Sequence, residues 1–275
     1  MSDLLKHWIR RVNVVITVGG YTVLAPFGYA ILALLCFVWR RDRMQRSRRL
    51  QFLTSRAYRF MHRWLTWTRI TVFDWRRTAG DLPQGACVVI ANHPTVMDVA
   101  AVTAMLGGAI SIVKPGVYRR AMIRPLMLGL GHVEGPGPDP IRIGRVVDDV
   151  VERLSWGIPV VIFPEGTRSP PGGLMPFGRV AFEIACRARV PLVSLAITCE
   201  PVYLSKQVPL FRPPHPTPRM CIDVLAVDEP DGTDSSRALR SRVERRYREW
   251  IRKVAAAGSR SYDPDAKETE CQKTS

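Results

Sequence analysis

The longest uncharged stretch of the chain runs from Val12 to Trp39 and limits how the N-terminal part can fold. Its 28 residues exceed the roughly 20 that an α-helix needs to cross the apolar core of a bilayer. The stretch is too long for the apolar region of a signal peptide, and it has no obvious small-residue cleavage site. A buried helix of a soluble domain is the weaker alternative, because so long an uncharged run is unusual there. The sequence therefore predicts a membrane-embedded segment.

Pro26 divides this segment nearly in half. Two topologies fit: a single kinked span, or a re-entrant helical hairpin whose arms are Val12–Leu24 and Phe27–Trp39. Both flanks are basic, which the positive-inside rule explains if both ends of the segment face the cytoplasm. The flanks slightly favour the hairpin. They also predict a protein of the cell inner membrane whose main domain, with any functional site it carries, faces the cytoplasm.

The chain is strongly basic, with 40 Lys and Arg against 24 Asp and Glu and a formal net charge of +16. Such a charge predicts an anionic partner, which could be nucleic acid, a membrane surface or a phosphorylated substrate. Six arginines fall within residues 40–49, directly after the uncharged segment. Clusters in this position attract anionic lipid by about 1 kcal/mol per residue. The placement favours membrane lipids, and not nucleic acid, as the partner.

Apolar residues keep helical spacing from Arg43 to Leu65, and arginines occupy much of the remaining surface. This pattern predicts a basic amphipathic helix lying on the membrane, with a surface helix packed on the domain as the alternative. We thus divide the chain into a membrane-associated region (residues 1–66), a main domain (67–257) and a polar, disordered tail (258–275).

Short apolar runs alternate with helical patterns through the domain. The runs at Cys87–Ala91 and Ile158–Phe163 predict buried strands, and the spacing from Ile143 to Leu154 predicts a helix. The alternation predicts an α/β fold with a largely parallel, mixed sheet flanked by helices. The six cysteines are scattered, which argues against a zinc site or disulfide framework and suits a reducing compartment.

His93 and Asp98 form the first candidate site. His93 lies two residues after the predicted strand at Cys87–Ala91, and Pro94 suits the first position of a helix, with Asp98 in or just after its first turn. A base and a carboxylate thus meet at a strand-to-helix corner, where open α/β sheets bind ligands. Alternatively, His93 is structural and Asp98 only caps the helix.

A second candidate site, Phe163–Ser169, follows the predicted strand at Ile158–Phe163 and can share an edge of the sheet with His93. Its arginine, Arg168, offers the bidentate fork that suits phosphate or carboxylate. Gly166 allows close approach of the backbone. An ion pair between Glu165 and Arg168 that only stabilises the loop is the alternative.

Together the two sites resemble the glycerolipid acyltransferase superfamily, whose best-known members are 1-acylglycerol-3-phosphate acyltransferases. His93 and Asp98 match the family's motif of His, four residues and Asp, and Phe163–Ser169 contains its Pro-Glu-Gly-Thr-Arg-Ser motif. Val190–Leu192 is similar to a third, weaker motif. The resemblance covers roughly residues 70–227.

The resemblance implies a membrane-associated O-acyltransferase of phospholipid biosynthesis. His93 would take the proton of an acceptor hydroxyl as it attacks a thioester, and Asp98 would hold the imidazole. The residues expected to bind the acceptor headgroup or order their loop are Glu165, Gly166, Thr167 and Arg168. The expected co-substrate is acyl-CoA or acyl carrier protein, and we expect no metal and no other cofactor.

One departure bears on the acceptor. Many members that acylate glycerol phosphates have a phosphate-binding arginine between the two motifs, whereas residues 131–138 here include none and Arg142 follows a different loop. The default acceptor is 1-acylglycerol 3-phosphate, with a specialised bacterial lipid of the ornithine or aryl-polyene type as the alternative. A non-catalytic, basic membrane-binding protein is the alternative from another class.

Overall fold

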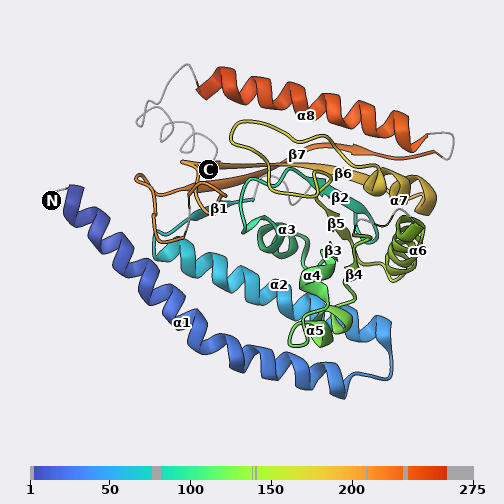
Figure 1. Ribbon diagram of the computed structural model, residues 1–275, viewed down its shortest axis with the longest axis horizontal. Coiled ribbons are helices and arrows are strands. Elements are labelled where there is room, and N and C mark those ends of the chain that lie inside the picture. The colour runs from blue at the N-terminus through green and yellow to red at the C-terminus, as the bar shows by residue number, and fades with distance from the viewer. Residues whose placement is uncertain are drawn as a thin grey trace.

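The computed structural model describes residues 3–75, 82–137, 139, 141–208, 210–231 and 235–258, and Figure 1 shows helices on both faces of a central sheet. The strands are β1 (Val72–Asp74), β2 (Val88–Ala91), β3 (Ile110–Val113), β4 (Val133–Glu134), β5 (Val160–Ile162), β6 (Leu192–Glu200) and β7 (Arg219–Asp228). The helices are α1 (Asp3–Val38), α2 (Arg43–Trp67), α3 (Asp98–Leu106), α4 (Pro115–Tyr118), α5 (Arg124–Gly129), α6 (Ile141–Ser155), α7 (Val180–Ala188) and α8 (Ser236–Gly258).

The seven strands have the order β1-β7-β6-β2-β5-β3-β4. Neighbouring strands are parallel except β6 and β7, which are antiparallel. The predicted largely parallel, mixed sheet is therefore confirmed. Every residue of β2 is buried, because helices cover both faces of the sheet, and this explains its uninterrupted apolar sequence.

Alternate residues of the central strands enter two different apolar layers. On one face, Val88 and Ile90 pack with residues of α6, α7 and α8, among them Val243. On the other face, Val89 packs with residues of α3, among them Val102. Side chains on a strand point to opposite faces in turn, so β2 joins both layers. This burial fixes the place where β2 ends and the first motif begins.

The inner face of helix α2 packs against α3 and forms part of the domain. Leu50 is fully buried, and the side chain of Gln51 both donates to the carbonyl of Leu130 (2.9 Å) and accepts from the N–H of Ala109 (3.1 Å). The large apolar side chains on its outer face are exposed: Phe52, Leu53, Phe60, Trp64 and Trp67. The inner face thus agrees with the alternative of a surface helix packed on the domain. Contact of the outer face with a membrane stays a prediction.

Helix α1 is continuous through Pro26, so the favoured hairpin topology is wrong. Proline removes one helical hydrogen bond and causes a bend, but it does not reverse the chain without turn residues beside it. Figure 1 shows the helix changing direction partway along. Residues Trp8–Val38 form one helix long and apolar enough to cross a membrane by length and composition.

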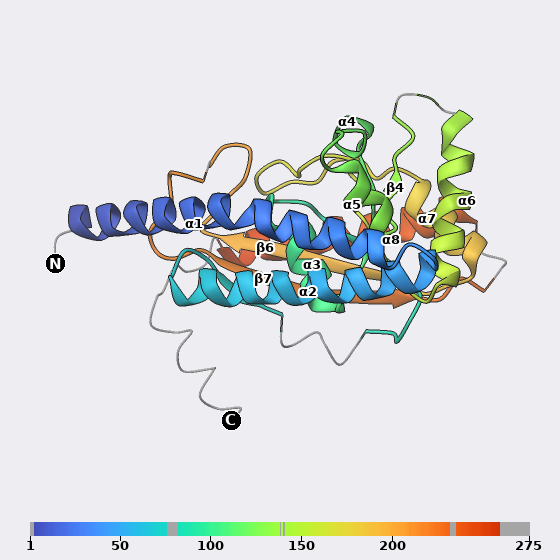
Figure 2. The same ribbon diagram turned by 90° about the horizontal axis from the view of Figure 1, so that it is seen from below.

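Helices α1 and α2 lie side by side in both views (Figures 1 and 2). Asn13 of α1 donates from its amide to the carbonyl of Thr68 (2.8 Å), and Val14 is 1% exposed. The opposite side of α1 exposes many large apolar side chains, among them Trp8, Ile16, Val23, Phe27, Ile31 and Phe37. The predicted tail lies outside the described residues from position 259 onward.

Candidate active site

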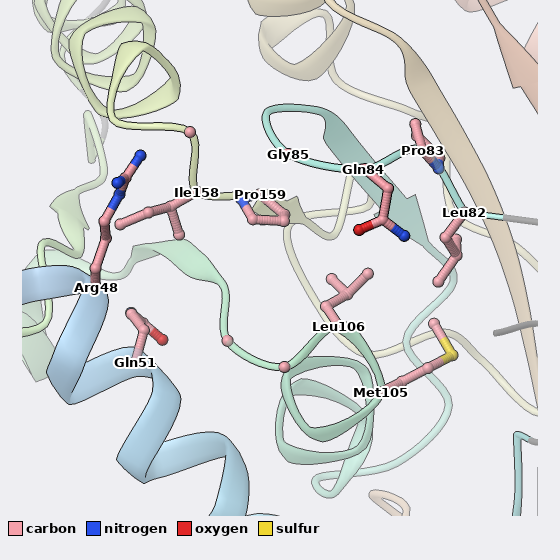
Figure 3. Close-up of a pocket in the computed structure, with 13 residues that line it drawn as sticks. Arg48, Gln51, Leu82, Pro83, Gln84, Gly85, Met105, Leu106, Ile158 and Pro159 are labelled. Carbon is pink, nitrogen blue, oxygen red and sulfur yellow. The ribbon is translucent and has the colours of Figure 1, made fainter. Parts of the chain in front are cut away.

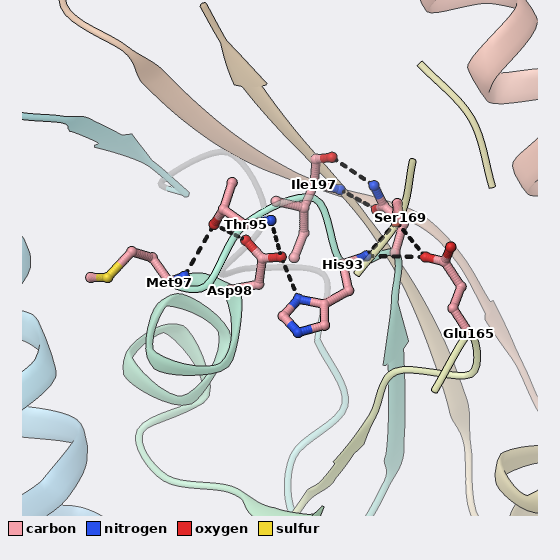
Figure 4. Close-up of polar contacts among 8 residues, drawn as sticks. His93, Thr95, Met97, Asp98, Glu165, Ser169 and Ile197 are labelled. Carbon is pink, nitrogen blue, oxygen red and sulfur yellow. Dashed lines mark hydrogen bonds and ion pairs between the residues drawn. The ribbon is translucent and has the colours of Figure 1, made fainter. Parts of the chain in front are cut away.

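The two sequence motifs meet at the carboxyl ends of β2 and β5. These strands are parallel neighbours, with Ile90 opposite Ile162. The loops that follow them therefore leave the sheet side by side, which brings His93 and Glu165 together although 72 residues separate them (Figure 4). The structure confirms that the two predicted sites share one edge of the sheet.

His93 and Asp98 form a hydrogen-bonded pair, with 2.7 Å between Nδ1 and Oδ2. An ionised carboxylate only accepts hydrogen bonds, so Nδ1 carries the proton and Nε2 has a free lone pair. Nε2 has no hydrogen-bond partner among the described residues, and the side chain of His93 is 18% exposed. The ring of Phe163 stacks on the imidazole at 4.3 Å between centroids. The free nitrogen is thus available to a proton donor from outside the protein.

Asp98 is fully buried at the first residue of α3. Its Oδ2 accepts from the N–H of Thr95 (2.8 Å), and its Oδ1 accepts from the Thr95 hydroxyl. Burial raises the pKa of Asp98, while the hydrogen bonds from His93 and Thr95 act to lower this pKa. These donors and the amino end of the helix favour the ionised carboxylate that orients His93.

Thr95 also explains why the predicted helix start at Pro94 is wrong. The Thr95 hydroxyl accepts from the N–H of Met97 (3.1 Å) while it donates to Asp98. These local hydrogen bonds hold the residues before Asp98 in a turn, as short hydroxyl side chains commonly do before a helix. The helix consequently begins at Asp98.

Asn92 sets the position of His93 by extending the pairing of β2 with β6. Its amide donates to the carbonyl of Ile197 (2.8 Å) and accepts from the N–H of the same residue (2.7 Å). The side chain thus replaces a backbone pair just where the main chain leaves the sheet. This lets the chain turn toward α3 without leaving buried polar groups of β6 unpaired.

Glu165 of the second motif holds the loops together. It is 9% exposed, and its carboxylate accepts from the backbone N–H of His93 (3.2 Å), the hydroxyl of Ser169 and the N–H of Met175 (2.8 Å). No ion pair joins Glu165 to Arg168 among the described residues, so the alternative based on that pair is not supported. The contacts support ordering of the loop by Glu165, one of its two expected roles.

The remaining motif residues lie nearer the surface. Gly166 has φ +65° and open space where a Cβ would lie, so it is the left-handed backbone, and not a close contact within the protein, that requires glycine. Thr167 and Arg168 are half-buried. The Thr167 hydroxyl accepts from the ammonium group of Lys206 (3.1 Å). This arrangement leaves Thr167 and Arg168 accessible to a ligand.

The sequence analysis assigned no individual role to four residues of the site: Thr95, Phe163, Ser169 and Lys206. Three of them lie within or beside the two motifs, so their place in the sequence was a usable signal. Lys206 lies in a proline-rich segment without periodic pattern, and no sequence signal pointed to it.

Two pockets lie at opposite edges of the sheet, one beside the candidate site and one at the far edge. A pocket of about 320 Å³ lies beside the motif loops and α8, where Pro94, Ser169 and Trp250 line it. A pocket of about 370 Å³ lies at the amino ends of the strands, between Gln51 and Pro159 (Figure 3). Parallel sheets bind ligands at the carboxyl ends of their strands, so the pocket beside the two motif loops is the better candidate for a substrate site.

Within the described ranges, no group of three or more His, Cys, Asp or Glu is arranged to hold a metal ion. His132 is structural: its Nδ1 accepts from the N–H of Ser111 (3.0 Å), and burial lowers its pKa to about 4. The cysteine nearest the site in sequence, Cys87, is buried, and burial raises its pKa to about 11, which disfavours the reactive thiolate.

Comparison with known proteins agrees with this geometry. A sequence model of the family described as Acyltransferase matches residues 76–198. The 1-acyl-sn-glycerol-3-phosphate acyltransferase BAT2 of Brassica napus is 29% identical over 53% of this chain and 44% of its own. The human 1-acyl-sn-glycerol-3-phosphate acyltransferase beta is 26% identical over 69% of this chain and 66% of its own.

The fold is also that of a solved structure, the 1-acyl-sn-glycerophosphate acyltransferase PlsC from Thermotoga maritima. The two share 18% identity with a TM-score of 0.66, over 93% of this chain and 98% of that one. The chain spans about half the length of the first curated relatives that it matches. The α/β fold, the two motifs side by side and these comparisons together support the glycerolipid acyltransferase superfamily for this chain.

Proposed function

We propose that the protein is a membrane-associated O-acyltransferase that moves a fatty acyl group from a thioester to the hydroxyl of a lysophospholipid. The default acceptor is 1-acyl-sn-glycerol 3-phosphate, and the donor is acyl-CoA or acyl carrier protein. The observation that carries the proposal is the 2.7 Å contact of His93 with the buried Asp98, beside the loop of the second motif. The names of the curated relatives support the choice of acceptor.

The chemistry follows from the free nitrogen of His93. The acceptor hydroxyl attacks the thioester carbonyl as Nε2 takes its proton, and Asp98 stabilises the resulting imidazolium. The tetrahedral intermediate collapses, the carbon–sulfur bond breaks, and the imidazolium returns the proton to the departing thiolate. The products are an ester and a free thiol. This sequence requires no protein nucleophile and no acyl-enzyme.

The exposed apolar surface of α1 and α2 supports membrane association. Four large apolar side chains are each at least 65% exposed: Trp8 and Phe27 on α1, and Phe60 and Trp67 on α2. Soluble proteins rarely expose so many large apolar side chains on adjacent helices. Basic residues flank this surface, as expected for contact with anionic lipid. We propose the inner membrane as the location, with the site on the cytoplasmic side.

A specialised lipid of the ornithine or aryl-polyene type is the second candidate acceptor. Arg142 is the first arginine after the loop at 131–138. Its Nε lies 3.6 Å from Oδ2 of Asp139, and its Nη1 lies 3.9 Å from Oε1 of Glu134. These carboxylates compete with a phosphate for the guanidinium group. This observation favours an acceptor that does not rely on that arginine.

Lipid profiling of a deletion strain, combined with a purified enzyme assay, tests the proposal. Loss of the diacyl product and accumulation of 1-acylglycerol 3-phosphate is the expected profile. In vitro, the purified protein should transfer a labelled acyl group to that acceptor. Loss of an ornithine or polyene lipid instead identifies the second candidate. No transfer to any acceptor with either donor supports the non-catalytic, membrane-binding alternative.

A further inference from the structure

A proline-rich segment outside both motifs makes contact with each of them. The carbonyl of Leu204 accepts from the N–H of Val96, next to the first motif's Thr95 (3.0 Å). The ammonium group of Lys206 donates to the hydroxyl of Thr167 in the second motif (3.1 Å). Residues 201–208 therefore form a strap across the rim of the site.

The backbone of this strap is anchored. Tyr203 is 1% exposed, and its hydroxyl donates to the carbonyl of Leu210. The hydroxyl of Ser205 accepts from the N–H groups of Gln207 and Val208, both at 3.1 Å. These contacts fix the turn that carries Lys206.

Leu204 adopts the left-handed backbone conformation, with φ +55°. This conformation is uncommon for a residue with a side chain, and it persists only where the surroundings enforce it. Such residues cluster at ligand-binding and catalytic sites. The conformation of Leu204 supports a functional role for the strap.

The strap adds a second cation to the rim. Lys206 is exposed and Arg168 is half-buried, and neither forms an ion pair with a carboxylate within the described part of the chain. The nearby carboxylate of Glu165 is occupied by His93, Ser169 and Met175. Two cations without a neutralising partner match a ligand group with two negative charges, and guanidinium and ammonium groups are the usual partners of phosphate.

We propose that Lys206 completes, with Arg168, the binding site for a phosphate monoester on the acceptor lipid. Thr167 holds the ammonium group in place before the ligand arrives. The inference rests on the proposed function, since it names the group by which the acceptor is recognised. It makes Lys206 a specificity-determining residue that lies outside both motifs.

Binding and turnover together test the proposal. In the inactive His93→Ala background, binding of 1-acylglycerol 3-phosphate and of monoacylglycerol with the same chain is measured in detergent micelles. Lys206→Gln should weaken binding of the phosphate lipid about tenfold or more, as for loss of one hydrogen bond to a charged group, and change monoacylglycerol binding less than about twofold. Lys206→Arg should restore most of the affinity. The matched control is Arg212→Gln, which removes an exposed cation from the same proline-rich region and should leave both affinities unchanged.

Equal affinities of the Lys206→Gln and parent proteins for the phosphate lipid would overturn the proposal, as would an equal loss for both lipids. Turnover is measured separately with His93 intact. If wild-type protein transfers no acyl group to 1-acylglycerol 3-phosphate, the proposed function fails, whereas the binding comparison still decides the role of Lys206.

Discussion

Ser169 and His93 form a reciprocal pair of hydrogen bonds across the two motif loops. The N–H of Ser169 donates to the carbonyl of His93 (2.8 Å), and the N–H of His93 donates to the hydroxyl of Ser169 (2.9 Å). The second motif therefore holds the main chain of His93, while Asp98 holds its side chain. His93 is thus held through its main chain and through Nδ1 of its imidazole before any substrate binds, which is the preorganisation that the proposed proton transfer needs.

Glu165→Gln should disturb this arrangement without touching the imidazole. In this variant an N–H₂ group replaces one of the two carboxylate oxygens. It faces either the N–H of Met175 or the donors of His93 and Ser169, so at least one buried donor loses its acceptor. We expect the free energy of unfolding to fall by about 1–3 kcal/mol and kcat/KM to fall with it. Thermal unfolding and acyl transfer of the purified variant measure both. The control is Glu249→Gln, at an exposed position on α8, which should change stability little.

Gly166→Ala should destabilise the loop through backbone conformation alone. An alanine there keeps φ near +65° only with strain, and no neighbouring atom lies within contact of its Cβ. The expected cost is about 1 kcal/mol. Gly144→Ala, in α6 with equally open surroundings, should instead stabilise by about 0.5–1 kcal/mol. Melting temperatures that move in the same direction for both variants would contradict this explanation.

Asp98→Asn should lower kcat more than it changes KM. The amide cannot accept every hydrogen bond that Thr95 and His93 donate, and it does not stabilise an imidazolium. We expect kcat to fall by about 10²–10⁴-fold, with the melting temperature also lowered because buried groups lose partners. The matched control, Asp148→Asn, removes an exposed carboxylate paired with Arg187 and should retain activity. A kcat within about threefold of wild type for Asp98→Asn would rule out its orienting role.

His132 should make the protein sensitive to acid at a site away from the chemistry. Its pKa is about 4 in the folded protein, below the ordinary value of about 6.5. The unfolded chain therefore binds the proton more readily, so stability is complete above pH 6.5 and is lost as pH falls toward 4. Protonation also ends the acceptor role of Nδ1 toward Ser111.

The measurement is the melting temperature of wild type and His132→Gln between pH 7.5 and pH 4, the window given by these two pKa values. Wild type should lose several degrees more than the variant over this range. Parallel curves would show that His132 does not control the acid response.

The sheet and the meeting of the motifs could be predicted because each has a local signal. Buried parallel strands such as β2 and β5 are continuous apolar runs, and the loops after their carboxyl ends meet at one edge wherever the strands are neighbours. His93, Asp98 and Glu165 could therefore be assigned to one site from the sequence.

The path of α1 and the strap carrying Lys206 could not be predicted, because both depend on contacts between distant segments. Pro26 favours a break equally for a kinked helix and for a hairpin, and packing of Asn13 and Val14 on the domain is invisible in the local sequence. Lys206 reaches Thr167 from 39 residues away through a segment without periodicity.

The His93→Gln variant tests the central claim most directly. Its transfer of a labelled acyl group to the acceptor identified by lipid profiling is compared with wild type, using purified protein of matched melting temperature. The account predicts that kcat/KM falls by at least about 10²-fold, the usual contribution of a general base, while binding of the acceptor is retained. Undiminished transfer by the folded variant would contradict the claim that His93 removes the proton from the acceptor hydroxyl.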